Sequence, residues 1–475
     1  MSSKTSPAVP DATGQLSAFS AAVDIGRAPA ACLDKLKLCV LDAMACMVQG
    51  STLPWSRLAA RTMAQQSAAG PARLFALDET ADAAAAAFAN ATAGHGFELD
   101  DIHKESILHP GSLAVPVALA LAQGDESCGP QRFYSALLAG YETGCRVGSA
   151  SAMPLFFRGF HPQGTAGAFV TAATAARFLG HTAQQTRDAL GIAGSLGAGL
   201  MAAQEGAMVK RAHAGWAAYA GVLAARLAGQ GFTGIANVVE ADYGGFLSAH
   251  AGQVDAARPL RGLGETWETL AVGHKPYASV TSIHAALDGV RKLMQDSGAD
   301  AAGIERLRIG VSQMTLAHCA WPYQAQSATA AQMNIYFCAA SLALYGDVFL
   351  RAFLPDRLAD PAIMDFIGRI EVYVDEAIEA GGPPLRHAAR VTLAAGGKEY
   401  VHEELHRRGS PENPMSPEAL YDKYRLVLGE VLAPGLVEEL GQAILASDTD
   451  RGWRDMLQAA DRAAAQAAAR PTARI

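Results

Sequence analysis

The spacing of apolar residues in the first part of the chain is typical of buried helices. In ACLDKLKLCVLDAMACMVQG, residues 31–50, apolar side chains recur every three or four positions, and Gly50 can close the helix. The positions that share this face are Leu36, Cys39, Val40, Ala43, Met44 and Met47. The pattern therefore predicts a helix that packs against a core.

Further helices are predicted up to residue 229. They span residues 79–93, 112–123, 130–150, 163–179, 182–204 and 211–229. Gly180 ends one of them, and Thr182 with Gln185 has the spacing of a capping box for the next. Several carry small residues on all sides, which allows close backbone packing and indicates burial on most sides. Residues 1–270 are therefore expected to form a helical bundle.

The hydrophobic period changes from that of helices to that of strands after residue 271. IERLRIGV (304–311) and RIEVYVDEA (369–377) alternate apolar and polar residues, and HAARVTLAAGGKEYVHEE (387–404) is typical of two strands joined at Gly396 and Gly397. Helix returns from Pro417 onward. A chain of 475 residues favours two domains over one. We expect a mainly α fold: a discontinuous helical domain of 1–270 and 408–475, and an α+β lid domain of 271–407.

A zinc-protease motif, H-E-x-x-H, occurs at His402 to His406 in VHEELHRRG. It binds zinc only on a helix, where residues four apart share one face. On the predicted strand these two histidines lie about 13 Å apart, at roughly 3.3 Å per residue. No third ligand pattern follows, so no metal is expected here.

Composition and charge argue against several classes of protein. The formal net charge is -8, without a basic cluster, which argues against nucleic acid as a partner. The seven cysteines are scattered and form no C-x-x-C pair, which favours a reducing cytoplasm. The first twenty residues lack the apolar stretch of a secretory signal and are expected to form a flexible arm. The uncharged stretches are too short to span a membrane.

The densest polar segment in the apolar half is HGFELDDIHKESILHPG, residues 95–111. An exposed loop between helices would explain its composition equally well. The functional alternative is that carboxylates and imidazoles held at helix ends exchange protons, with pKa values tuned by burial and by neighbouring charges.

Three other segments offer candidate chemistry. His161 precedes a helix whose N-terminal amides favour an anion, although a lone histidine is more often structural. Lys210 stands with Arg211 and His213 at the start of an apolar helix. Cations there are usually surface groups, whereas a buried lysine binds carboxylates or works with a lowered pKa. Lys275 and Tyr277 lie at the domain junction, a favoured place for small-molecule sites.

These segments, taken in order, resemble the MmgE/PrpD family, which includes 2-methylcitrate dehydratase, cis-aconitate decarboxylase and iminodisuccinate epimerase. The resemblance covers nearly the whole chain. It rests on KLKLCVLDAMACMVQG, FELDDIHKESILHPGSLAVPVALALA, GYETGCRVG, GFHPQGTAGAFVTAATAARFLG, MVKRAHAGWAAYAGVLAARLAGQGFTG, HKPYASVTSIHAALDGV and RGSPENPMS. It implies a helical domain made from both chain ends, an α+β lid, a homodimer, and an active site between the domains without metal or organic cofactor.

The resemblance also implies site residues. The histidines of the family's HPG and GFHP motifs correspond to His109 and His161. The two active-site lysines of the family correspond to Lys210 and Lys275. The acidic position of the family, where aspartate is common, corresponds to Glu98.

The family's D-D-x-H motif is matched by Asp100, Asp101 and His103. The chain departs from the family at Phe337, where a tyrosine is usual, with Tyr336 one residue earlier. Such a change puts a decarboxylase that relies on this tyrosine in doubt.

All the family's reactions make or break a bond beside a carboxylate, so negative charge that spreads into that carboxylate must be stabilised. Lys210 and Lys275 are expected to bind a small di- or tricarboxylate, and His109 and His161 to donate or accept protons. The acidic groups of Glu98 or Asp101 are expected to orient them.

Lys210 is alternatively the base if burial lowers its pKa. His103 joins the catalytic set, and Asp100, Tyr277 and Tyr336 join Lys275 beside the substrate.

The leading functional expectation is a cofactor-independent lyase similar to 2-methylcitrate dehydratase. A decarboxylase of the cis-aconitate type and an epimerase of the iminodisuccinate type are the alternatives. A non-catalytic binding protein that has kept the cleft is a third, motivated by Phe337. Because proteins with the same fold can catalyse different reactions, the resemblance does not distinguish these alternatives.

Overall fold

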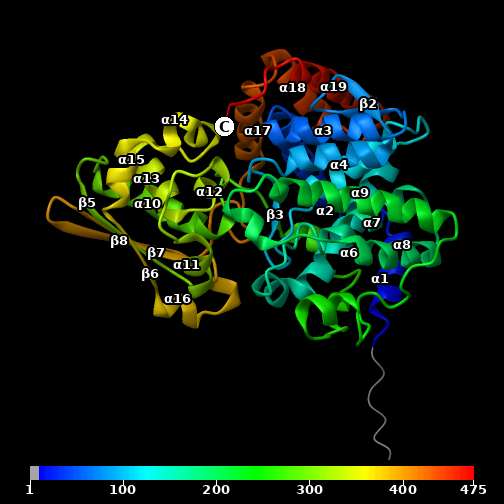
Figure 1. Ribbon diagram of the computed structural model, residues 1–475, viewed down its shortest axis with the longest axis horizontal. Coiled ribbons are helices and arrows are strands. Elements are labelled where there is room, and N and C mark those ends of the chain that lie inside the picture. The colour runs from blue at the N-terminus through cyan, green and yellow to red at the C-terminus, as the bar shows by residue number, and fades with distance from the viewer. Residues whose placement is uncertain (1–9, 475) are drawn as a thin grey trace, which may run out of the picture.

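The computed structural model describes residues 10–474, and Figure 1 shows a large helical lobe beside a smaller lobe that contains a sheet. The fold is mainly α with a smaller α+β part, as the hydrophobic pattern predicts. Among the described residues, none of the helices has the length and apolar character needed to cross a lipid bilayer.

The larger lobe is built from long helices of the first half of the chain. Their bounds are α1 Ala12–Ala22, α2 Ala30–Gly50, α3 Pro54–Gln66, α4 Ala83–Gly94, α5 Gly111–Ala122, α6 Pro130–Phe157, α7 Gly167–Phe178, α8 Ala183–Leu196 and α9 Val209–Gly229. Two short antiparallel ribbons accompany them: β1 Ala72–Leu74 with β2 Glu79–Ala81, and β3 Ile102–His103 with β4 Val272–Gly273.

Small residues let these helices approach closely. A Cβ atom added to Gly221 of α9 would lie 2.5 Å from the backbone carbonyl carbon of Thr171 in α7, closer than real Cβ contacts allow. The hydroxyl of Thr171 donates a hydrogen bond to the carbonyl of Ala217 at 2.7 Å. Glycine at residue 221 is therefore what brings α7 and α9 together.

Three sequence expectations need correction. The helix predicted over 182–204 ends at Leu196, because a Cβ at Gly197 would lie 2.6 Å from the carbonyl oxygen of Thr165, and a separate 3-10 turn follows at Met201–Glu205. The first three residues of the helix predicted over 79–93 form β2 instead. Helix α1 begins at Ala12, capped by the Asp11 carboxylate, so only residues 1–9 of the expected arm lie outside the described residues.

The smaller lobe contains a four-stranded sheet of order β6-β5-β7-β8. The strands are β5 Ile304–Val311, β6 Ile370–Val374, β7 Ala389–Ala395 and β8 Lys398–Glu404. Only the β5–β6 pair is parallel. The predicted hairpin is confirmed: Gly396 and Gly397 both have positive φ, 58° and 71°, as a tight two-residue turn between β7 and β8 requires.

Helices cover one face of this sheet and connect its strands. Helix α10 packs against β7 and β8. The bounds are α10 His284–Ser297, α11 Gln313–Cys319, α12 Ala328–Gln332, α13 Ile335–Tyr345, α14 Pro355–Leu358, α15 Pro361–Ile367 and α16 Glu376–Ala380.

The end of the chain returns to the larger lobe. Helices α17 Pro417–Gly429, α18 Pro434–Leu445 and α19 Asp450–Ala468 lie beside α2 and α3 (Figure 1). From α17, the buried Lys423 ammonium pairs with Asp42 of α2 at 2.5 Å and donates a hydrogen bond to the carbonyl of Leu99 at 2.7 Å. The last helices therefore hold the loop that precedes β3.

Candidate active site

The segment that joins α4 to α5 has unusual backbone geometry. Glu98 and Ile107 are the non-glycine residues with positive φ among residues 10–474, at 57° and 55°. Such conformations are costly for residues with a side chain and persist where surrounding contacts fix them. Antiparallel pairing of β3 with β4 joins this segment to residues 272–273, just before Lys275. The candidate site lies around this segment.

The Glu98 carboxylate, which is buried, binds three cations from distant parts of the chain. The ammonium of Lys210 pairs with Oε1, and Nη1 of Arg211 approaches the same oxygen at 2.6 Å. The Lys275 ammonium lies 3.2 Å from Oε2 and 3.1 Å from the carbonyl oxygen of Glu98. These contacts explain the strained backbone of Glu98, because all three cations converge only if its side chain points inward.

Charge and burial act against each other in this cluster. Burial opposes ionisation of Glu98, but Lys210, Lys275 and Arg211 outweigh it and hold the pKa of the carboxyl well below its usual range. Burial, only partly offset by Glu98, lowers the pKa of Lys210 to about 8. Lys210 is therefore a buried cation with a partner, and not the surface group that its residue type alone would favour.

Two histidines flank one carboxylate behind this cluster. His95 Nδ1 donates a hydrogen bond to Asp100 Oδ2 at 2.8 Å, and His109 Nδ1 lies 3.4 Å from Asp100 Oδ1. Burial lowers the pKa of His109 to about 3 despite Asp100. Burial also disfavours the Asp100 carboxylate, but His109 and His95 lower its pKa below the usual range. Gln163 fixes the backbone of His109 by accepting from its N–H at 2.9 Å.

A second imidazole pair faces the same region. His161, in the turn before α7, lies with its Nδ1 2.8 Å from Nδ1 of His213 on α9. Burial, together with the charge of Lys210, keeps the pKa of His161 well below its usual range. The ring centroids of His161 and His95 are 5.9 Å apart. Four imidazoles therefore lie within one buried cluster.

These groups surround a small cavity of about 70 Å³ between the two lobes. Five predicted residues, Glu98, His109, His161, Lys210 and Lys275, line it. The remaining wall combines apolar and polar side chains: Ile102, Lys104, Ile107, Phe156, Pro162, Met201, Val280, Thr281, Ser282, Met314, His318, Met333 and His387. The structure thus brings together the imidazoles and cations that sequence reasoning could only suspect of converging.

The structure places the two motif residues Asp101 and His103 behind the cavity wall. Asp101 accepts hydrogen bonds from the N–H of Gly111 at 2.9 Å and from the Tyr141 hydroxyl at 3.1 Å. Burial and neighbouring carboxylates raise its pKa to about 8. His103 Nε2 lies 3.0 Å from Glu268. Both residues thus hold the loop and the start of α5 in place.

The aromatic residues singled out in the sequence also lie outside the cavity wall. The Tyr277 hydroxyl donates to Asp288 at 2.8 Å, and Tyr336 packs half-buried against the core. Phe337 is fully buried, with its ring centroid 4.9 Å from that of Tyr323. The lost hydroxyl at Phe337 therefore changes the core and not the wall of the cavity.

Within residues 10–474, one set of residues has ligand atoms close enough for a metal ion: His95, Asp100 and His109, all within 4.8 Å of one another. In this structure His95 is hydrogen-bonded to one Asp100 oxygen, whereas Asp100 Oδ1 and His109 Nδ1 lie 3.4 Å apart, and within residues 10–474 neither has a hydrogen-bond partner. The H-E-x-x-H histidines are arranged differently, because His402 lies on β8 and His406 follows it. The helix that this motif needs is not formed at residues 402–406.

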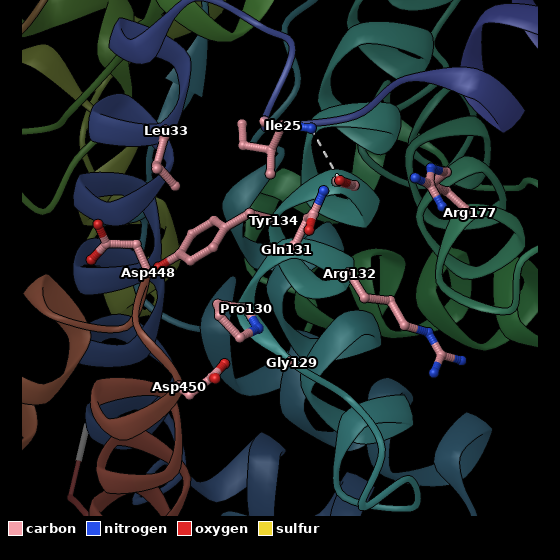
Figure 2. A pocket seen from close by; sticks show the side chains of 12 residues that line it. Ile25, Leu33, Gly129, Pro130, Gln131, Arg132, Tyr134, Arg177, Asp448 and Asp450 are labelled. Carbon is pink, nitrogen blue, oxygen red and sulfur yellow. Dashed lines mark hydrogen bonds between the residues drawn. The ribbon is translucent and has the colours of Figure 1, made fainter.

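Another hollow, of about 710 Å³, opens at the start of α6 and shares no lining residue with this cavity (Figure 2). Three of its four charged groups have partners within the described chain, and the fourth, Asp450, is exposed. Arg132 pairs with Asp125 at 2.6 Å, Arg177 donates to the carbonyl of Val23 at 2.8 Å, and Asp448 pairs with Lys37 at 3.1 Å. This hollow offers no convergent acid–base groups.

Sequence reasoning missed several side chains of the site. His95 stands at the edge of the polar segment, and Arg211 and His213 were noted only as neighbours of Lys210. His318 and His387 come from the smaller lobe and occur in stretches without a recognisable motif. For His318 and His387, no local signal was present.

A buried cavity lined by imidazoles and ammonium groups is the kind of site that acid–base enzymes use. Profile comparison agrees: the MmgE/PrpD N-terminal domain matches residues 14–258, and the MmgE/PrpD C-terminal domain matches residues 277–449. The chain belongs to the MmgE/PrpD family.

Three relatives similar to this chain are named as cis-aconitate decarboxylases or as similar to them. A cis-aconitate decarboxylase-like protein, oryM, of Aspergillus oryzae is 29% identical over 450 residues, covering 90% of this chain and 93% of its own. Cis-aconitate decarboxylase of Aspergillus terreus is 29% identical over 440 residues, with 88% and 90% covered. The human cis-aconitate decarboxylase is 25% identical over 370 residues, with 75% and 74% covered.

Proposed function

We propose that this lyase of the MmgE/PrpD family removes carbon dioxide from an unsaturated tricarboxylic acid of the cis-aconitate type. The observation that carries the proposal is the cavity in which His109, His161, Lys210 and Lys275 converge. The decarboxylase names of the relatives support this reaction over the dehydration that the sequence first suggested.

The charge balance of the site suits an anionic substrate. Three cations, Lys210, Arg211 and Lys275, contact the Glu98 carboxylate. The Asp100 carboxylate lies against His95 and His109, so these five charged groups sum to one net positive charge in a buried place. Fixed charges in a low-dielectric site stabilise negative charge on a substrate more strongly than the same charges in water. A carboxylate beside the breaking bond is therefore expected next to Lys210 and Lys275.

Where the larger lobe meets Pro384 of the smaller lobe, the cavity wall has a cation without a carboxylate partner. Lys104 lines the cavity and donates to the carbonyl of Pro384 at 2.6 Å, and among residues 10–474 no carboxylate forms an ion pair with it. Nδ1 of the neighbouring His387 is buried without a hydrogen-bond partner in the same described range. These groups suit a second carboxylate, remote from Lys210.

The reaction needs one proton on carbon. When the bond to the departing carboxylate breaks, its electron pair moves into the allylic system, and the negative charge spreads into a carboxylate held by the lysines. His161 or His109 then delivers a proton to carbon. Both imidazoles have lowered pKa values in the free enzyme, so a bound polyanion is what raises their proton affinity.

The test uses the protein with a panel of citrate-, aconitate- and aminosuccinate-type acids in deuterium oxide, with products followed by mass spectrometry. The proposal expects loss of carbon dioxide from an aconitate-type acid and one deuterium on carbon in the product. Water loss would favour the dehydratase, deuterium exchange alone the epimerase, and binding without change the non-catalytic protein.

Variants test the residues. His109→Ala and Lys210→Ala are each expected to lower turnover at least about tenfold while the protein still folds. His402→Ala, half-buried on the edge strand β8, is the matched control and should turn over at the wild-type rate. Near-normal turnover by either site variant would refute its role.

We also propose that residues 1–270 with 408–475 act as one domain and 271–407 as a lid. Packing of α17 against α2 supports this division. A cytoplasmic homodimer is the accompanying expectation, for which sedimentation of the purified protein is the measurement.

A further inference from the structure

The contact between His161 and His213 links a residue of the cavity wall to one outside it. The two Nδ1 atoms are 2.8 Å apart, and the ring centroids are 5.0 Å apart. Gly199 packs against both: a Cβ added there would lie 3.3 Å from the His161 side chain and 3.3 Å from the His213 ring. The backbone N–H of His161 also donates to the carbonyl of Gly199 at 3.0 Å. The rings are thus held in a fixed relation.

A hydrogen bond between two Nδ1 atoms constrains the protons on both rings. One nitrogen must carry hydrogen and the other must offer a lone pair, so the tautomer of one ring fixes that of the other. His161 lines the cavity, whereas His213 is not part of its wall. Whichever tautomer His213 adopts therefore decides whether Nε2 of His161 can take and give a proton.

We propose that His213 is a positioning residue that accepts the Nδ1–H of His161 and thereby keeps Nε2 of His161 as its proton-transferring atom. The inference rests on the proposed function, since the proton concerned is the one delivered to the substrate carbon. In this arrangement His213 carries its own hydrogen on Nε2 and stays neutral throughout the reaction.

The proton balance follows from this arrangement. With substrate bound, His161 is an imidazolium whose Nδ1–H is donated to His213. Its Nε2–H bond breaks as a C–H bond forms with the electron pair released by the departing carbon dioxide. His161 is then neutral with its hydrogen still on Nδ1, and water restores the proton to Nε2 after product leaves. No tautomer exchange is needed between turnovers.

The charged groups around the pair agree with a neutral His213. Burial, with His95 and Lys210 nearby, lowers the pKa of His213 to about 4. Burial, Lys210, a charged His213 and His95 disfavour charge on His161, while Glu98 favours it. A neutral acceptor at His213 stabilises an imidazolium at His161 by hydrogen bonding without adding a buried charge.

Nitrogen chemical shifts of the folded enzyme test this directly. With ¹⁵N-labelled histidine, and with the His161 signals identified by their loss in His161→Gln, the proposal expects Nδ1 protonated and Nε2 unprotonated in the free wild type. His213→Leu should give a mixture of both tautomers. An Nε2-protonated His161 in the wild type would overturn the proposal.

Kinetics supply the second readout. His213→Leu is expected to lower kcat at least about tenfold with KM changed less than threefold, because transfer of the proton and not binding is affected. His213→Asn, whose amide oxygen can accept at the position of Nδ1, should recover most of kcat. His402→Leu is the control for loss of a histidine elsewhere. Equal kcat in His213→Leu and wild type would contradict the inference.

The proposed function and the role of His213 can fail independently of each other. If the wild type converts none of the acids, the proposed function fails, yet the nitrogen shifts still decide whether His213 fixes the tautomer of His161.

Discussion

Lys210 is the residue whose chemistry depends most on its surroundings. Its burial and its neighbours Glu98 and Arg211 bring its pKa to about 8, close to the working pH of most enzymes. Below this pH the side chain is an ammonium that can hold a carboxylate, and above it a neutral amine that cannot. The same titration would activate it as a base.

The pH dependence therefore separates the two roles. If Lys210 binds carboxylate, kcat/KM should show an additional fall of about tenfold per pH unit above about pH 8, beyond the fall that the required protonation of His161 already imposes. Lys210→Met should be slow and lack this descent. Because Asp101 also has a pKa of about 8, Asp101→Asn is the control and should retain the descent. A rise in kcat/KM above pH 8 would identify Lys210 as the base.

Lys104 is predicted to bind a second carboxylate of the substrate, remote from Lys210. Lys104→Met should raise KM for a tricarboxylate by about tenfold, the loss expected for roughly 1.4 kcal/mol, and change kcat little. For a substrate that lacks the remote carboxylate, the wild type and the variant should have the same KM. Lys292→Met, which removes an exposed lysine from α10, is the matched control. Equal effects on both substrates would place Lys104 outside the site.

At the scale of elements, close helix packing sets stability. Gly221→Ala would push a Cβ into the backbone of Thr171, so α7 and α9 must separate, and the free energy of unfolding should fall by about 1–3 kcal/mol. Gly435→Ala in α18, where a Cβ would meet nothing within 4 Å, should leave stability unchanged or slightly raised. Urea denaturation of both variants measures the difference, and equal midpoints would refute this view of the α7–α9 contact.

The elements were largely predictable from local patterns. The hairpin at Gly396 and Gly397 follows from two glycines between alternating strands, and the capping box at Thr182 from its spacing. The break after Leu196 was not predictable, because residues 189–204 are uniformly rich in small apolar residues. What ends the helix is the approach of the distant Thr165 carbonyl to Gly197.

The site residues that stand in local sequence motifs were predictable, and those placed by tertiary contacts were not. His109, His161, Lys210, Lys275 and Glu98 stand in motifs that resemble a known family, and all line the cavity. Residues that act through tertiary contacts give no signal of their own. Only the contacts of the folded chain place His213, His318 and His387 at or beside the cavity.

At the scale of the whole molecule, metal dependence is a sharp test. Dialysis against a chelator should leave activity within twofold of its starting value, because both Asp100 oxygens face the imidazoles of His95 and His109. Metal analysis of the dialysed and undialysed protein is the companion measurement. Stoichiometric metal, with activity that falls on removal and returns on readdition, would make this trio a metal site.

The ion pair of Lys423 with Asp42 affects when the enzyme becomes active during its synthesis. The loop next to Glu98 receives its buried anchor at the Leu99 carbonyl from a residue in the last eighth of the chain. During synthesis, Glu98 and its lysine partners are translated long before this anchor. The enzyme should therefore gain activity only once its final helices have left the ribosome, and a chain stopped before residue 423 should remain inactive even with every cavity-lining residue present.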